Sequence, residues 1–229
     1  MYEGKSKKIF FTEDPQLIKI CFKDDITAFN RQKHDIIAGK GELNADISAY
    51  LFQLLESKEI KTHFIERHGK NCFIAKRLEM LPIEVVCRNI AMGSLLKRIP
   101  VERGQILDTP IIEFFYKNDE LGDPLINEDH LVSMGILTWE EISFIKKVTI
   151  RINEILSDFF SKKSLTLVDF KLEFGKDEEG NIILGDEISP DTCRIWDSQT
   201  KEILDKDRFR LGRDDVLEGY KEIYARIMG

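Results

Sequence analysis

The most informative segment of this chain is residues 167–175, where apolar and charged side chains alternate without interruption. The apolar members are Val168, Phe170, Leu172 and Phe174, and the charged members are Asp169, Lys171 and Glu173. Because successive side chains of a strand point to opposite faces, one face would pack in a core and the other would present two carboxylates around an ammonium. The pattern predicts a strand, and both a solvated structural face and a functional face remain open.

A second apolar run, residues 182–187, ends in the adjacent acids Asp186 and Glu187. If the intervening residues close an antiparallel hairpin, Asp186 lies roughly opposite Lys171 and shares its face. Carboxylates that converge beside a lysine can hold Mg²⁺, which prefers oxygen ligands and bridges substrate phosphates. A lysine there could offset charge as phosphate is transferred. The alternative is a structural cluster of ion pairs, and these residues alone leave both interpretations open.

The elements around this hairpin are a mixture of strands and helices. Short apolar runs predict strands at residues 8–11, 17–22, 72–78, 83–87 and 110–116. Apolar spacing predicts helices over residues 42–55, 138–160 and 214–228. Thr138 and Glu141 can form a capping box at the start of the second helix. We therefore expect an α+β chain with two lobes, a β-rich lobe over residues 1–90 and an α+β lobe over residues 91–229.

Composition excludes several classes of protein. The chain has 229 residues and a formal net charge of −7, so it lacks the basic excess typical of nucleic-acid-binding proteins. It has no apolar leader and no apolar stretch of about 18 residues, so we expect no membrane span. The cysteines, Cys21, Cys72, Cys87 and Cys193, are scattered, and their spacing indicates neither a metal site nor a disulfide framework. Free thiols are typical of a reducing cytosol, and we expect a cytoplasmic protein.

Three further segments could contact phosphate groups. Near the N-terminus, Gly4 would allow close backbone approach while Lys5 and Lys7 supply charge. Arg88 with Ser94, and Arg194 just past the hairpin, offer guanidinium and hydroxyl donors that suit phosphate. Each segment could instead be an ordinary solvated loop. The four histidines show no metal-binding or catalytic spacing, and we interpret them as structural or exposed.

Five segments together resemble one known family. Residues 81–94 (LPIEVVCRNIAMGS) resemble the first signature of the phosphoribosylaminoimidazole-succinocarboxamide (SAICAR) synthases, and residues 167–175 (LVDFKLEFG) resemble the second. The opening Tyr-x-Gly-Lys-x-Lys, residues 185–191 (GDEISPD) and residues 205–210 (DKDRFR) also fit, in the same order. The matches span nearly the whole chain.

The resemblance implies a two-lobed α+β fold that grips ATP in a cleft similar to that of kinase and ATP-grasp folds. The N-terminal lobe would be the ATP-binding lobe, and the C-terminal lobe would hold the metal and substrate site. The implied reaction is the ATP-dependent joining of L-aspartate to the carboxylate of carboxyaminoimidazole ribotide (CAIR). Its products would be SAICAR, ADP and phosphate, in de novo purine biosynthesis.

The resemblance also implies roles for individual residues. ATP phosphates would contact Lys5 and Lys7, and Lys76 would lie by the adenine or the hinge between the lobes. Glu173 and Asp186 would bind Mg²⁺. Arg88, Ser94 and Arg194 would hold the phosphate or carboxylate of CAIR. Asp169, Lys171 and Asp191 would line the reacting centre.

Departures from the family pattern leave some contacts unassigned. In the loop at residues 25–30, Phe29 and Asn30 stand where some relatives have glycine and aspartate. Asn30 is therefore a weak candidate for a substrate contact. The aspartate site cannot be placed from the sequence, and Arg208 and Arg210 are weak candidates for it.

Two other functions compete with the ligase. A small-molecule kinase would make ADP without inorganic phosphate, and a nucleotide-binding regulatory module would not turn over. The paired acids and the separate basic loops favour an enzyme, because a sensor needs only the nucleotide site. The resemblance also makes a homodimer the expected assembly. The helix at residues 138–160 could be core or interface, and its apolar stripe favours core. We expect neither nucleic acid nor a membrane as a partner.

Overall fold

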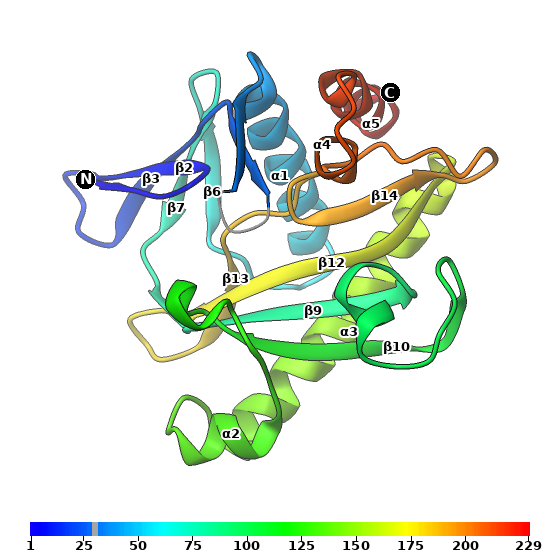
Figure 1. The fold of residues 1–229 in the computed structure, drawn as a ribbon. Helices are drawn as coiled ribbons and strands as arrows, with labels where there is room; N and C mark the ends of the chain where they lie inside the picture. Colours follow the sequence, from blue (N-terminus) through cyan, green and yellow to red (C-terminus); the bar gives the residue numbers. More distant parts are fainter. Residues whose placement is uncertain (29–31) are drawn as a thin grey trace.

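The computed structural model describes residues 1–28 and 32–229, and its N-terminal part forms an antiparallel five-stranded sheet. The strand order is β1-β2-β3-β7-β6. These strands are β1 (Tyr2–Glu3), β2 (Lys7–Phe11), β3 (Leu17–Phe22), β6 (Phe64–His68) and β7 (Cys72–Lys76). Helix α1 (Lys40–Glu56) buries its apolar face against β3, β6 and β7 (Figure 1). A small hairpin, β4 (Asp25–Ala28) and β5 (Lys33–Ile36), precedes α1.

The C-terminal part is built around a second sheet of seven strands. The order along its main path is β11-β10-β9-β12-β13, and β8 and β14 also pair with β12. These strands are β8 (Glu79–Met80), β9 (Ile83–Ile90), β10 (Ile106–Tyr116), β11 (Leu125–Ile126), β12 (Leu165–Lys176), β13 (Ile182–Gly185) and β14 (Cys193–Asp197). Strand β12 is thus the alternating segment found in the sequence, and it lies at the centre of this sheet.

The central position of β12 decides between the two interpretations of its charged face. Strands β9 and β8 pair along one edge of β12, and β14 and β13 pair along the other. Asp169 and Glu173 are therefore buried together with the apolar residues between them. Buried carboxylates require charged or hydrogen-bonding partners, so a solvated structural face is excluded.

Helix α3 (Trp139–Lys162) runs along one face of this sheet and packs on β12, β9 and β10 (Figure 1). Its N-terminus has the predicted capping box, in which Thr138 and Glu141 each accept a hydrogen bond from the other's backbone N–H. The remaining helices are α2 (Glu128–Ser133), α4 (Asp207–Arg210), α5 (Val216–Met228) and the 3-10 turns η1 (Gly93–Lys97) and η2 (Asp119–Leu121). Within the described ranges, no helix is long and apolar enough to cross a membrane.

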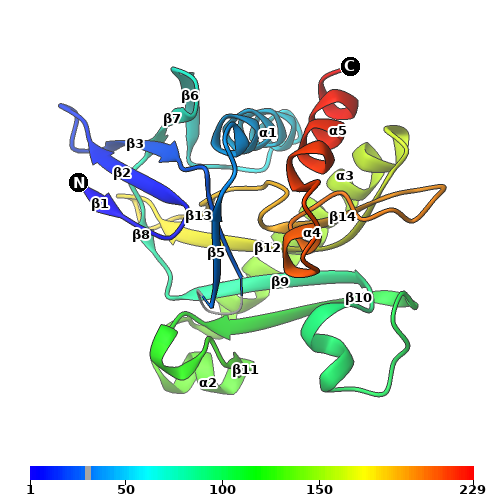
Figure 2. The ribbon, with the colours of Figure 1, turned by 45° about the horizontal axis from the view of Figure 1, so that its top comes forward.

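The change from one sheet to the other falls between β7 and β8. Strands up to Lys76 belong to the first sheet, and β8, which starts at Glu79, already pairs with β12. One contiguous apolar core contains residues of both sheets, including Phe73 and Leu172. Helices α1 and α5 lie side by side, with α4 just before α5 (Figure 2). The division into lobes at residue 90 stays a prediction.

The hairpin β12–β13 is confirmed, but the predicted position of Asp186 opposite Lys171 is wrong, because β13 ends just before Asp186, where the chain turns. Glu173 pairs with Gly185, and β13 ends there. Asp186 follows in the left-handed conformation, with φ of 58°. Because this turn interrupts the alternation, the Asp186 side chain does not pair across the hairpin with Lys171 and instead meets Lys7 from β2.

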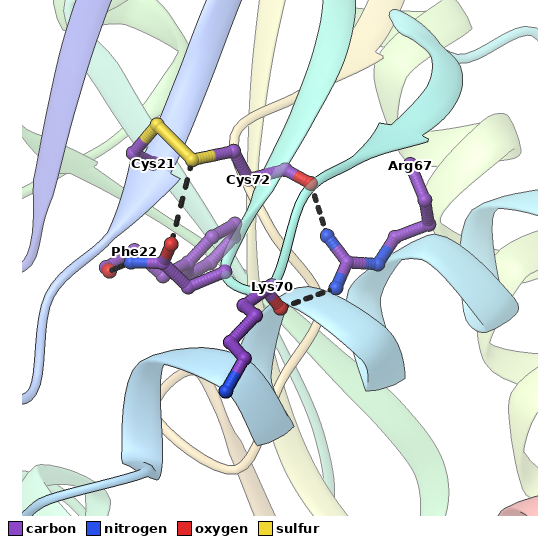
Figure 3. Close-up of a disulfide and its surroundings, with 6 residues drawn as sticks. Cys21, Phe22, Arg67, Lys70 and Cys72 are labelled. Carbon is purple, nitrogen blue, oxygen red and sulfur yellow. Dashed lines mark hydrogen bonds between the residues drawn. A yellow bond between two sulfur atoms is a disulfide. The ribbon is translucent and has the colours of Figure 1, made fainter.

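The prediction of free thiols is wrong for one pair of cysteines. Cys21 on β3 and Cys72 on β7 lie directly opposite each other and form a disulfide, although they are 51 residues apart in sequence (Figure 3). Spacing along the chain gave no sign of this pairing, because the register of two strands brings the residues together. The Arg67 guanidinium donates to the carbonyls of Cys72 and Lys70 beside the bridge. Cys87 and Cys193 are free and buried, as expected.

Candidate active site

Two neighbouring cavities meet along β12. The larger, about 920 Å³, is lined by residues of β2, β3 and β7 on one side and by β12 and the loop after β13 on the other. The smaller, about 300 Å³, is lined by residues of β9, β12, β14 and η1. Glu84, Lys171, Asp191 and Thr192 line both cavities. These residues form the shared wall, where molecules bound in the two cavities would come into contact.

Carboxylates in the larger cavity are paired with lysines from distant parts of the chain. The Lys7 ammonium contacts Asp186 and lies 2.9 Å from Glu187 Oε1. Lys171 Nζ lies 2.6 Å from Glu173 Oε1 and 2.9 Å from Glu84 Oε1. Lys117, which follows β10, also pairs with Glu173. Ammonium groups thus occupy the space in front of both carboxylates that the sequence assigned to a metal.

The ionisation of these groups reflects their mutual attraction. Burial alone would lower the pKa of Lys171, but the carboxylates of Glu173, Glu84 and Asp186 outweigh burial and raise the pKa well above its usual value. Burial alone would raise the pKa of Asp186, yet Lys7 and Lys171 hold it below its ordinary range. Lys171 and Asp186 are therefore both charged at neutral pH, as binding of phosphate and cations requires.

The larger cavity has donors that fit a divalent cation. Among the described residues, no three acidic, histidine or cysteine side chains form a complete metal site. Glu173 and Asp186, however, both present carboxylate oxygens to the same cavity. Mg²⁺ is commonly held by one or two carboxylates and completed by substrate phosphates and water, so this donor set fits Mg²⁺ together with a nucleotide.

The smaller cavity contains a buried network of guanidinium and carboxylate groups. Arg88 Nη1 lies 3.0 Å from Asp169 Oδ2, and its Nη2 lies 3.1 Å from Ser94 Oγ. Its Nε donates to Glu113 at 2.7 Å. Arg194 Nη1 reaches the same Asp169 oxygen at 2.7 Å from β14. One buried carboxylate thus orients two guanidinium groups toward the cavity.

Gly93 is required for the close approach of Arg194 to η1. Its φ is +60°, a conformation that residues with a side chain rarely adopt. A Cβ at this position would lie 2.8 Å from Arg194 Nη2. The Gly-Ser pair recognised in the sequence therefore has a double role, because the glycine admits the guanidinium while Ser94 contacts Arg88.

Asp191 in the shared wall is held by residues from two helices. Lys40 Nζ, from the start of α1, lies 2.7 Å from Asp191 Oδ2, and Asn44 Nδ2 lies 2.8 Å from the same oxygen. The Tyr220 hydroxyl of α5 donates to Oδ1 at 2.7 Å. Lys40 is almost fully buried. Burial would raise the pKa of Asp191, but Lys40 and Lys206 lower it well below its usual value, so it is a fixed anion.

His63 borders the larger cavity behind Asp186. Its Nε2 lies 3.1 Å from the Asp186 carbonyl oxygen, and since a carbonyl can only accept, the ring donates this hydrogen bond. Burial lowers the pKa of His63 to about 4, so the ring is neutral at pH 7. This histidine is structural, as expected, and it supports the left-handed turn at Asp186.

The structure brings the sequence-predicted residues to the two cavities. Those that line the larger cavity are Lys5, Lys7, Lys76, Lys171, Glu173, Asp186 and Asp191. Those that line the smaller cavity are Arg88, Ser94, Asp169, Lys171, Asp191, Arg194 and Arg210. Arg208 lines neither, because it is buried between Glu202 and Asp215 and donates to the Ile203 carbonyl. Asn30 lies outside the described residues.

Several residues of the site were missed in the sequence. They are Glu84, Lys117, Glu187, Lys40, Asn44, Tyr220 and Lys206. Glu84 and Glu187 lie inside the quoted signatures, and Lys206 lies in the DKDRFR segment, so a local signal existed for them. Lys40 and Lys117 had none, because their partners are 151 and 56 residues away.

Comparisons with known proteins agree with this arrangement. The sequence profile of the family described as SAICAR synthetase matches residues 1–227. The phosphoribosylaminoimidazole-succinocarboxamide synthase of Thermococcus kodakarensis is 53% identical over 229 residues, which are 100% of this chain and 97% of that protein. Similar relatives include the synthase of the same name from Methanopyrus kandleri, 49% identical over 100% of this chain and 93% of that protein.

A solved structure extends the likeness to the fold. It is described as SAICAR synthetase (Type-2) in complex with ADP, with a TM-score of 0.97 and 53% identity over 100% of this chain and 97% of that one. This likeness confirms the predicted two-lobed α+β fold class. The profile match and the identity over the full chain show that this protein belongs to the SAICAR synthetase family.

Proposed function

We propose that the two cavities bind the two large substrates separately and that the reaction occurs at their shared wall. As a member of its family, the chain is an ATP-dependent ligase that joins L-aspartate to the carboxylate of CAIR, giving SAICAR, ADP and phosphate in purine biosynthesis. The observation that carries the proposal is the position of Lys171 and Asp191, which line both cavities.

The larger cavity is proposed to bind ATP. It is the roomier of the two, and Lys5 and Lys7 line it from the glycine turn, where they suit the phosphates. Lys76 lies at the end of β7, with the apolar side chains of Ile18 and Ile20 lining the same cavity. Such apolar residues suit a purine base. The ADP complex of the similar solved protein supports this assignment.

Glu173 and Asp186 are proposed to hold Mg²⁺. When bound, the ion would neutralise charge on the ATP phosphates. Lys7 and Lys117 would then exchange their carboxylate partners for phosphate oxygens, since both ammonium groups already lie in the cavity. Lys171 would remain beside the transferred phosphoryl group and stabilise its charge.

The smaller cavity is proposed to bind CAIR. Arg88, Ser94 and Arg194 would hold its phosphate, because guanidinium and hydroxyl donors match phosphate oxygens. Asp169 does not need to touch the ligand, since it fixes the two guanidinium groups. The CAIR carboxylate would then point to Lys171 at the shared wall.

The chemical steps follow from this placement. A CAIR carboxylate oxygen attacks the γ-phosphorus of ATP, the bond to ADP breaks, and an acyl phosphate forms. The aspartate amine then attacks the acyl carbon, a C–N bond forms, and phosphate leaves with the carboxylate oxygen while the nitrogen loses a proton. Charge develops on oxygen in both steps. The protein therefore lowers the activation barrier mainly by positioning the reactants and by stabilising this charge with the Lys171 ammonium.

Product analysis tests this function. Purified protein with ATP and Mg²⁺ should release ADP and phosphate in equal amounts only when CAIR and aspartate are both present. ADP without inorganic phosphate would indicate the kinase reaction instead. ATP binding without turnover would indicate the regulatory module.

We also propose that the chain forms a homodimer. Trp139 and Phe144 expose apolar surface on α3, and Phe144 borders an apolar cavity of about 530 Å³ together with Val148 and Ile182. An exposed apolar patch of this kind is typical of an interface. Sedimentation of the purified chain should give twice the monomer mass, and a monomer would contradict the proposal.

A cytoplasmic location is proposed from the metabolic role. In a reducing cytosol the Cys21–Cys72 bridge would be open, because glutathione and thioredoxin keep thiols reduced. Alkylation of free thiols in cells lysed directly into denaturant tests this, because Cys87 and Cys193 are buried in the folded chain. Four labelled cysteines would support the cytoplasmic location, and two would support an oxidising compartment.

A further inference from the structure

Asp191 and Lys206 form an unusual couple in the shared wall, because their opposite charges lie close together without a hydrogen bond. Lys206 Nζ lies 3.9 Å from Asp191 Oδ1. Among the described residues, this carboxylate is the nearest anionic partner of Lys206. Both side chains line the larger cavity. Lys206 precedes α4, and Asp191 follows the turn after β13.

The Asp191 carboxylate is oriented with one oxygen toward this couple. Its Oδ2 accepts hydrogen bonds from Lys40 and Asn44 and has no room for another strong donor. Within the described chain, Oδ1 accepts one hydrogen bond, from the Tyr220 hydroxyl. A carboxylate oxygen can accept about two, so Oδ1 keeps one acceptor position near Lys206.

Lys206 shares its nearest carboxylate, Asp191, with Lys40. Lys40 already balances Asp191, and Arg210 pairs with Asp207. Burial lowers the pKa of Lys206, and Arg210 and Lys40 add to the lowering, although Asp191 and Glu187 oppose it. An anionic group bound at Lys206 would offset the unfavourable burial of its positive charge. The surroundings therefore favour a ligand that brings a negative charge next to Lys206 and a hydrogen-bond donor next to Asp191.

We propose that the Asp191–Lys206 couple is the subsite for the α-amino-acid end of L-aspartate, with the α-amine on Asp191 Oδ1 and the α-carboxylate on Lys206. An amine and a carboxylate on one carbon match an anion and a cation that lie side by side. This inference deepens the ligase function proposed above and rests on it.

The location of the couple suits the second chemical step. Asp191 lines both cavities, so an amine held at its Oδ1 is next to the place where the CAIR carboxylate and Lys171 meet. The buried contacts with Lys40, Asn44 and Tyr220 fix the acceptor in one orientation, which reduces the entropy cost of aligning the amine. Residues 205–210 thus gain a role that the sequence left unassigned.

Steady-state kinetics of Lys206→Met test the subsite. Removal of a hydrogen bond between charged groups costs about 1.5–3 kcal/mol, so we expect the KM for L-aspartate to rise about 10- to 100-fold. The KM values for ATP and CAIR should stay within about twofold of wild type. Lys206→Arg should restore part of the aspartate affinity. The exposed Lys221→Met on α5 is the matched control, and melting temperatures verify that each variant folds.

Two aspartate analogues sharpen the test, because each lacks one carboxylate. β-Alanine lacks the α-carboxylate, and L-alanine lacks the β-carboxylate. We expect the wild-type preference for aspartate over β-alanine, measured as the ratio of kcat/KM values, to collapse in Lys206→Met. The preference for aspartate over L-alanine should survive.

The outcomes separate this inference from the proposed function. If the wild type forms SAICAR but Lys206→Met raises the KM for CAIR rather than for aspartate, the subsite assignment is wrong. An unchanged preference over β-alanine in the variant would also overturn it. If the wild type forms no SAICAR with all three substrates, the ligase function itself fails.

Discussion

The two cavities on either side of the shared wall hold their charges in different ways. In the larger cavity, the carboxylates of Glu173 and Asp186 are held by lysine ammonium groups on flexible stems, and Lys117 remains 38% exposed. In the smaller cavity, Arg88 is 4% exposed and contacts Asp169 and Glu113 through a planar fork. The lysine partners in the larger cavity can be exchanged for other anions, whereas the Arg88 contacts of the smaller cavity are buried within the sheet.

The difference indicates what each cavity has to do. Lysine is a compact charge that can move from a carboxylate to a phosphate, so the larger cavity can admit both a cation and a polyphosphate. Arginine binds oxyanions through a fixed array of donors and loses little further freedom on binding. The smaller cavity is thus preformed for one phosphorylated ligand, whereas the larger one rearranges its ion pairs.

The largest expected effect on stability concerns the five-stranded sheet that lines the larger cavity. This sheet is cross-linked by a disulfide, whereas the smaller cavity is held together by buried ion pairs. Reduction of the Cys21–Cys72 bridge, or the Cys21→Ser/Cys72→Ser variant, should cost about 4 kcal/mol of unfolding free energy, because the bridge closes a loop of 51 residues. Urea unfolding with and without reductant measures this. Cys87→Ser/Cys193→Ser keeps the bridge and should keep the dependence on reductant, whereas Cys21→Ser/Cys72→Ser should lose it. Equal curves for oxidised and reduced wild type would contradict the prediction.

Arg88→Met should sharpen the contrast between buried and exchangeable pairs. It leaves Asp169 and Glu113 buried with one cationic partner fewer each, and we expect a loss of about 3 kcal/mol in unfolding free energy. Lys117→Met is the counterpart in the larger cavity and should cost less than about 1 kcal/mol, because its side chain is partly exposed. Urea unfolding of both variants measures the two losses in unfolding free energy. Similar losses would show that the two cavities do not differ in this way.

The pH dependence of stability should report on His63 behind the larger cavity. Its pKa is about 4 in the folded chain and about 6.5 when unfolded, so the unfolded state takes up the proton first as pH falls. Stability is fully present above about pH 6.5 and decreases by roughly 3 kcal/mol toward pH 4. Urea unfolding at several pH values should show a shallower loss for His63→Gln. The exposed His68→Gln should keep the wild-type slope, and a wild-type slope for His63→Gln would refute the role of this ring.

Lys171→Ala should separate chemistry from stability at the shared wall. We expect kcat to fall by ~10²-fold or more, equivalent to about 2.7 kcal/mol, because the ammonium stabilises charge on the transferred group. Lys176→Ala is the matched control on the same strand, since its partner is Glu141 outside both cavities. Near-normal turnover of a folded Lys171→Ala protein would remove Lys171 from the proposed mechanism.

Local patterns predicted much of the site because its residues cluster in short segments. The alternation along β12 placed Asp169, Lys171 and Glu173 on one face, and the capping box located the start of α3. The family resemblance then assigned Arg88 and Arg194, which the structure places on the same carboxylate. A short segment was sufficient wherever the functional residues and their geometry lie on one strand.

Long-range pairing was not predictable in the same way. The bridge between Cys21 and Cys72 depends on the register of β3 against β7, and the contact of Lys40 with Asp191 depends on how α1 packs. The turn at Asp186 also escaped, since a left-handed aspartate has no marker in the sequence. These features arise from tertiary packing, which no local spacing encodes.

The transfer of an oxygen atom across the shared wall is the most direct test of the proposed division between the cavities. CAIR labelled with oxygen-18 in its carboxylate would be converted with ATP and aspartate, and the released phosphate analysed by mass spectrometry. If the CAIR carboxylate accepts the phosphoryl group of ATP at Lys171, each phosphate carries one labelled oxygen. Unlabelled phosphate, formed together with SAICAR, would show that the carboxylate never meets the nucleotide there.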